Sequence, residues 1–273
     1  MKASEETKNR YSGKSIIIVG GGLLQRPAVE IAKQLGLQAV VTDRNPRCAC
    51  RWDADMFALI DTKDIAAHIE LARGLRGLVG IFVGGASVEM TAAGVAEELC
   101  LPGIDLNTAY RIANKAEMRR SLDEVKGIPS VRFAVYDDWE QFINDWKVFP
   151  CIIKATDSSG SRGAFKARQA TDITLEQFAH TQSISSDRRV LVEELLQPDP
   201  QEEIAEQSVE TVWYEGKGHW LNWVDRPFLK FDKYAVEIGH YNPAMHSVEK
   251  QQEVEQMVLM AGVALKMTTG IFK

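Results

Sequence analysis

The stretches that decide the fold are Phe149–Phe165, FPCIIKATDSSGSRGAF, and Val190–Leu196, VLVEELL. In the first, two apolar runs of strand length flank a small, polar, glycine-containing loop, which predicts two strands joined by Thr156–Gly163. Lys154 ends the first strand, where its ammonium needs a partner. A phosphate is one such partner, because backbone N–H groups of the following loop can close over it. An ordinary β-turn remains the alternative for this loop.

The second stretch ends in two adjacent carboxylates, Glu193 and Glu194. Successive side chains of a strand point to opposite faces, so one of the two should face a cleft. Glu206 opens a further alternating segment that leads into Thr211–Tyr214. Taken singly, each segment fits an ordinary solvated strand face as well.

The N-terminal third begins with an apolar strand, Ser15–Val19, and a glycine turn formed by Gly20, Gly21 and Gly22. A helix follows the turn, and together they predict an anion site. Asp43 stands where a dinucleotide-binding unit carries its ribose acid, but Gln25 occupies the third glycine position of that fingerprint. The turn therefore favours a small substrate, and an NAD-dependent oxidoreductase stays open as a rival.

Strands and helices continue to alternate up to about residue 107, which predicts a Rossmann-like parallel-sheet domain over residues 1–107. A helical stretch from about Thr108 to Val125 and three short strands place linker helices and a small domain at residues 108–189. Residues 190–273 are rich in strands, and the hairpin signal at Glu215–Gly218 predicts an antiparallel lobe.

Composition narrows the class of protein. The 273 residues carry a net charge of −6, which gives no general attraction to nucleic acid or to an anionic membrane. No apolar run reaches the length of a membrane span, and Met1–Ser12 lacks the apolar centre of a secretory signal. The four cysteines show no zinc-site spacing and are expected to be free thiols. We therefore expect a cytoplasmic protein with no nucleic-acid or membrane partner.

The order of these features resembles the ATP-grasp superfamily, in the branch of the carbamoyl-phosphate synthase large subunit and biotin carboxylase. The resemblance runs from about Ser15 to Lys273. It implies a fold of mixed α/β and α+β class: a Rossmann-like domain, a small lid, and a larger antiparallel lobe that is incomplete at its C-terminal end. ATP would lie between the last two parts.

The resemblance also assigns residues to the nucleotide. Lys115 matches the lysine that precedes the lid, and Lys154 matches the lid lysine; both would contact phosphates. The residues matching the lid loop are Ser158, Ser159, Gly160, Ser161, Arg162 and Gly163. The residues matching the adenine and ribose contacts are Glu193, Glu194, Leu196 and Glu206, with the Glu194 carbonyl and the Leu196 N–H at the adenine edge. The match of Glu206 to the ribose-binding carboxylate depends on the alignment of Pro198–Ile204, which could shift it.

For the acceptor side, the resemblance suggests Arg226, His240 and Asn242 as catalytic residues. Arg226 could hold a phosphate or carboxylate through a bidentate contact; a surface ion pair is the alternative. A hydrogen-bonded structural role is the alternative for His240. The glycine turn, together with Glu89, would face a substrate from the first domain.

The function implied by the resemblance is an ATP-dependent ligase that joins a carboxylate to an amine or thiol through an acylphosphate. The expected cofactors are ATP and Mg²⁺, the partners are small molecules, and a homodimer is expected. The metal ligands remain unidentified, with Glu210 and Glu237 the nearby candidates, because the chain stops where the last catalytic strands would begin. A fragment of a longer enzyme is the expectation, and a non-catalytic nucleotide-binding protein is the second rival.

Overall fold

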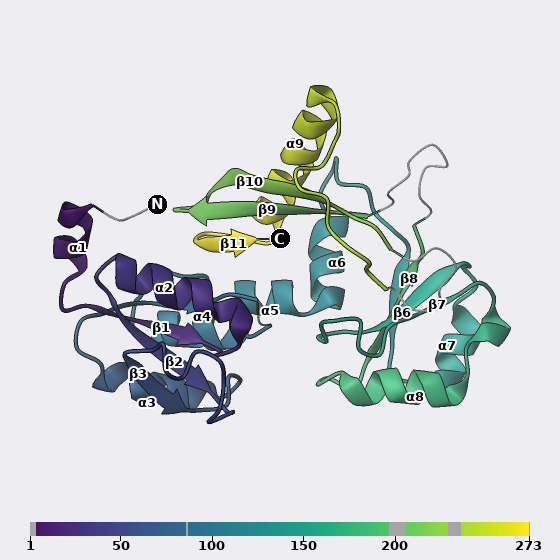
Figure 1. The fold of residues 1–273 in the computed structure, drawn as a ribbon. Helices are drawn as coiled ribbons and strands as arrows, with labels where there is room; N and C mark the ends of the chain where they lie inside the picture. The colour runs from purple at the N-terminus through teal and green to yellow at the C-terminus, as the bar shows by residue number, and fades with distance from the viewer. Residues whose placement is uncertain (1–3, 86, 197–205, 229–235, 273) are drawn as a thin grey trace. The chain divides into compact units, whose positions relative to one another are not determined.

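The computed structural model describes residues 4–85, 87–196, 206–228 and 236–272. The chain divides into two compact units, Met1–Ala113 and Asn114–Lys273 (Figure 1). The finer division into 1–107, 108–189 and 190–273 stays a prediction.

The first unit is built on a four-stranded parallel sheet in the order β3-β2-β1-β4. Its strands are β1 (Ser15–Val19), β2 (Gln38–Asp43), β3 (Met56–Leu59) and β4 (Leu78–Val83). Its helices are α1 (Glu5–Tyr11), η1 (Leu23–Gln25), α2 (Arg26–Gln34), α3 (Ile65–Gly74), α4 (Glu89–Glu98) and α5 (Leu106–Ala113). Ile18 of β1 packs with Val29 of α2, whereas Ile17 enters a separate core with Val95 of α4. Helices therefore cover both faces of the sheet, as the alternation predicts.

The helical stretch expected from about Thr108 to Val125 consists of two helices, α5 and α6 (Lys115–Asp123). Asn114 separates them, because its side-chain oxygen accepts hydrogen bonds from the N–H groups of Ala116 and Glu117. Asparagine followed three residues later by glutamate is a helix-start pattern. The predicted stretch gave no position for the break between the two helices, because this cap was overlooked. The boundary between the two units falls at the same point.

After α6, the second unit forms an antiparallel sheet in the order β5-β8-β6-β7, which we call the lid sheet. Its strands are β5 (Phe133–Tyr136), β6 (Cys151–Ala155), β7 (Phe165–Ala167) and β8 (Val190–Glu194). Its helical segments are α7 (Trp139–Asp145), η2 (Ala170–Asp172) and α8 (Leu175–Ile184). The core on one face includes Ile153 and Val192, packed against Phe178 of α8. Because side chains alternate along a strand, Lys154 and Glu193 share the opposite face.

The remaining part of the second unit is a three-stranded sheet in the order β10-β9-β11, which we call the lobe sheet. Its elements are β9 (Glu206–Tyr214), β10 (Lys217–Arg226), α9 (Val248–Ala264) and β11 (Gly270–Phe272). Strands β9 and β10 are antiparallel and are joined by the tight turn Glu215-Gly216, whose φ angles are +50° and +76°. Helix α9 packs on this sheet at Gly262, where a Cβ would lie 2.0 Å from the Trp213 ring. The predicted antiparallel lobe is thus confirmed.

Candidate nucleotide-binding site

The centre of the candidate site is the carboxylate of Glu193, which is only 2% exposed. Its Oε1 lies 2.5 Å from Arg119 Nε of α6, and its Oε2 lies 2.5 Å from Lys154 Nζ of β6. Burial alone would raise the pKa of Glu193, but the charges and hydrogen bonds of Lys154 and Arg119 outweigh it and hold the pKa below its ordinary value. One carboxylate thus faces two cations, which favours a further anion nearby.

Lys115 belongs to the same cluster. It stands one helical turn before Arg119, so both side chains project from the same side of α6. Its ammonium donates a hydrogen bond to the backbone oxygen of Ser158, in the lid loop, at 2.5 Å. The structure therefore brings Lys115, Lys154 and the lid loop together. Glu193 joins Lys154 to Arg119 of α6, and Lys115 of the same helix binds the loop.

The partner of Lys154 in the structure is a carboxylate, whereas the sequence pointed to a phosphate. The two are compatible because a lysine ammonium has three N–H donors. One of them goes to Glu193. The others can turn toward a phosphate.

The lid loop has one anchored end and one open turn. Gly163 has φ +69°, its oxygen accepts from Thr181 Oγ1 at 2.8 Å, and a Cβ there would lie 2.8 Å from Ile184 Cδ1. Gly160 has φ +66°, and a Cβ there would meet no atom within 4 Å. Ser158 Oγ is buried and has no hydrogen-bond partner among the described residues. Ligand atoms can therefore approach the Gly160 end, whereas α8 fixes the Gly163 end.

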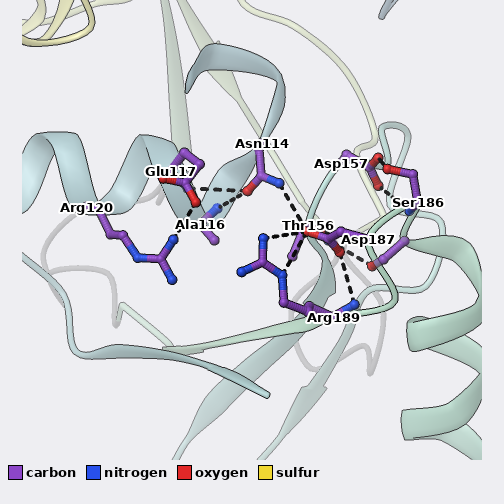
Figure 2. Close-up of polar contacts among 10 residues, drawn as sticks. Asn114, Ala116, Glu117, Arg120, Thr156, Asp157, Ser186, Asp187 and Arg189 are labelled. Carbon is purple, nitrogen blue, oxygen red and sulfur yellow. Dashed lines mark hydrogen bonds and ion pairs between the residues drawn. The ribbon is translucent and has the colours of Figure 1, made fainter. Parts of the chain in front are cut away.

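A polar network supports the start of α6, and sequence reasoning missed it (Figure 2). Asp187 accepts hydrogen bonds from Thr156, Asn114 and Arg189. The backbone N–H of Lys115 in turn donates to Thr156 O at 2.7 Å. Because Asn114 Oδ1 and Thr156 O already bind the first N–H groups of α6, the helix start offers the lysine ammonium rather than backbone donors to an anion.

The residues expected at the adenine edge are Glu194, the last residue of β8, and Leu196, two residues further along. Glu194 N–H donates to Arg132 O at 2.8 Å, and Leu195 N–H donates to Pro150 O at 2.9 Å. Leu196 is 70% exposed, and among the described residues its N–H has no hydrogen-bond acceptor. The Leu196 N–H can therefore donate a hydrogen bond to a bound base. The assignment of that base as adenine stays a prediction.

The residues expected on the acceptor side form a second cluster on β10 and the segment after it. Arg226 Nη1 lies 2.7 Å from Glu206 Oε1, Arg226 Nη2 pairs with Glu237, and His240 also pairs with Glu237. Asn242 is exposed in the same segment. Lys154, by contrast, pairs with Glu193 of the lid sheet. Glu206 thus contacts Arg226, its ribose role stays a prediction, and the Pro198–Ile204 segment that sets its register lies outside the described residues.

The glycine turn of the first unit is held by its own chain. Gly21 N–H donates to Asp43 Oδ2 at 2.8 Å, and Asn45 N–H donates to Asp43 Oδ1 at 2.7 Å. Gly21 has no room for a side chain, because Cys48 Sγ lies 2.4 Å from its Cβ position. Asp43 therefore has a structural role here, which weakens the dinucleotide interpretation. Glu89 is the first residue of α4, and the substrate roles of this turn and of Glu89 stay predictions.

Solved structures match this chain over nearly its whole length. The L-amino acid ligase of Bacillus licheniformis has a TM-score of 0.75 at 18% identity, over 94% of this chain and 61% of that one. The biotin carboxylase domain of 2-oxoglutarate carboxylase from Hydrogenobacter thermophilus, a dimer in complex with MgADP, ADP and bicarbonate, gives 0.73 at 17% identity, over 94% and 59%. This chain has the ATP-grasp fold.

Sequence comparison points the same way. The formate-dependent phosphoribosylglycinamide formyltransferase of Burkholderia thailandensis is 26% identical over 250 residues, which are 88% of this chain and 57% of that protein. No protein-family model matches the chain. This ATP-grasp chain spans less than two thirds of each of these three proteins. Among the described residues, no helix is long and apolar enough to cross a membrane.

Proposed function

We propose that this chain binds MgATP at the Lys115–Lys154 cluster and serves an ATP-dependent ligase that joins a carboxylate to an amine or thiol. The observation that carries the proposal is the pairing of Arg119 and Lys154 with one buried carboxylate, Glu193, while Lys115, one helical turn before Arg119, binds the lid loop. The proposal is supported by the ATP-grasp fold and by the MgADP complex of the similar biotin carboxylase domain.

In this proposal, Lys115 and Lys154 neutralise the phosphates, and backbone N–H groups around Gly160 close over them. Such preorganised charge is what phosphoryl transfer requires, because negative charge shifts among the phosphate oxygens in the transition state. The Glu194 carbonyl and the Leu196 N–H meet the adenine edge. Glu206 binds the ribose after releasing Arg226.

The chemistry has two steps. An oxygen of the substrate carboxylate attacks the γ-phosphorus of ATP, the bond to the bridging oxygen breaks, and ADP leaves. The amine nitrogen or thiol sulfur then attacks the acyl carbon, the carbon–oxygen bond breaks, phosphate leaves, and the nucleophile loses a proton. Arg226 holds the carboxylate by paired hydrogen bonds, and His240 and Asn242 line the acceptor pocket.

The described residues show no ligand set for magnesium. Among the described residues, no group of three or more His, Cys, Asp or Glu side chains could hold a metal ion. Glu237, one of the candidates, pairs with Arg226 and His240. In this proposal Mg²⁺ enters with the nucleotide, and no step is assigned to it.

Calorimetric titration with MgATP and with NADH tests the proposal. Wild type should bind MgATP, and Lys154→Met should weaken binding about ten- to one-hundredfold, because a charge-assisted phosphate contact contributes about 1.5–3 kcal/mol. The control is Lys147→Ala, since the Lys147 ammonium donates to Ile143 O at an exposed helix end, away from the proposed site residues in the sequence. Binding of NADH alone, or equal affinity of wild type and Lys154→Met for MgATP, would refute the proposal.

A further inference from the structure

Asp187 lies in the turn between α8 and β8 and gathers donors from three segments (Figure 2). Its Oδ1 accepts from Thr156 Oγ1 at 2.8 Å and from Arg189 N at 3.0 Å. Its Oδ2 accepts from Asn114 Nδ2 at 3.2 Å and from Arg189 Nη2 at 2.9 Å. A carboxylate with this many donors has a fixed orientation.

The partners of Asp187 are the groups that define the start of α6. Asn114 is 3% exposed and caps the helix, and Thr156 is fully buried and accepts the backbone N–H of Lys115 at 2.7 Å. Lys115, the first residue of the helix, places its ammonium on Ser158 O. Asp187 therefore contacts both Asn114 and Thr156, the two residues that hold the backbone at the start of α6, where Lys115 lies.

Electrostatics keep Asp187 in the form that this role needs. Burial would raise its pKa, but hydrogen bonds from Thr156 and Arg189 and the charge of Arg189 hold the pKa below its ordinary value. The carboxylate is thus ionised at neutral pH, where it accepts hydrogen bonds and donates none.

We propose that Asp187 is a positioning residue of the nucleotide site: it aims Lys115 at the lid loop by holding Asn114 and Thr156 in place. The inference rests on the proposed binding of ATP at this site. Asp187 itself does not touch the nucleotide. Its loss lowers affinity only through Lys115.

A double-mutant cycle separates positioning from a general effect on the fold. MgATP affinity is measured for wild type, Asp187→Asn, Lys115→Met and the double variant. Asp187→Asn should weaken binding about tenfold in the wild-type background and less than about twofold in the Lys115→Met background. Equal factors in both backgrounds, or no effect in either, would overturn the inference.

Asp157→Asn is the matched control. Asp157 also joins the β6 end to the α8–β8 turn, but within the described part of the chain its oxygens bind only Ser186. Its substitution should leave affinity within about twofold of wild type. Should Asp187→Asn fail to fold, Asn114→Ser replaces it, because serine still caps the helix but lacks the amide donor to Asp187. Unchanged affinity of Asn114→Ser would also contradict the inference.

Hydrogen exchange of the nucleotide-free protein tests the positioning without any ligand. The amides of Ala116 and Glu117 should exchange faster in Asp187→Asn than in wild type and Asp157→Asn. Unchanged exchange would reject the positioning role. If the exchange changes but wild type binds no MgATP, the positioning stands and the proposed function fails.

Discussion

At the scale of single residues, two adjacent glutamates on one strand have opposite environments. Glu193 is 2% exposed and bound to Arg119 and Lys154, while Glu194 is exposed at the strand end. Strand alternation predicts that one of them turns inward, but not which one. The pairing of Glu193 with Ile152 decides this, because it puts Glu193 on the face that carries Lys154.

Glu193→Gln should destabilise the protein by about 3 kcal/mol near neutral pH, because it leaves two partly buried cations without their carboxylate. The native pKa of Glu193 lies below its ordinary value of 4.5, so its contribution is complete above about pH 4.5 and is lost as the pH falls through the native pKa. Urea unfolding at neutral and at acid pH measures both effects.

The matched control is Glu194→Gln, an exposed position one residue away, which should change stability by less than about 0.5 kcal/mol. The difference between wild type and Glu193→Gln should shrink in acid. A constant difference at every pH, or none at all, would show that the Glu193 charge does not hold the cluster.

At the scale of elements, the hairpin that carries the site was predictable from sequence. The expected strands Phe149–Ala155 and Ala164–Arg168 correspond to β6 (Cys151–Ala155) and β7 (Phe165–Ala167). Apolar runs and small loop residues are local signals, so they can be recognised without knowing what the rest of the chain contacts. Helix α8 was missed because its segment is mainly polar, although Thr174 and Gln177 form a capping box at its start.

The two lid-loop glycines should respond differently to alanine. Gly163→Ala combines a positive φ with a Cβ 2.8 Å from Ile184 Cδ1, so it should cost about 2–3 kcal/mol of stability. Gly160→Ala has the positive φ but no neighbour within 4 Å, so about 1 kcal/mol is expected. Thermal unfolding of both variants gives the comparison.

The effects of these substitutions on MgATP affinity should not follow their effects on stability. Gly160→Ala places a methyl group and a strained turn where the phosphates are proposed to lie, so it should weaken MgATP binding although it folds. If Gly160→Ala binds MgATP like wild type, the open turn is not the part of the loop that covers the nucleotide.

At the scale of the whole molecule, the sequence indicated a parallel-sheet unit, a lid and an antiparallel lobe, and the ATP-grasp fold is confirmed. It did not reveal the contacts that organise the site. Arg119 and Glu193 are 74 residues apart, and Asn114 and Asp187 are 73 apart. Such pairs depend on how α6 meets the lid sheet, which no local pattern encodes.

Hydrogen–deuterium exchange of the full chain with and without MgATP tests the location of the nucleotide most directly. Binding at the proposed site should slow exchange in three segments, around Lys115–Arg119, Ser158–Gly163 and Glu193–Leu196, and leave Gly20–Gly22 unchanged. Protection confined to the glycine turn of the first unit, or no protection in the three segments at saturating MgATP, would contradict the account.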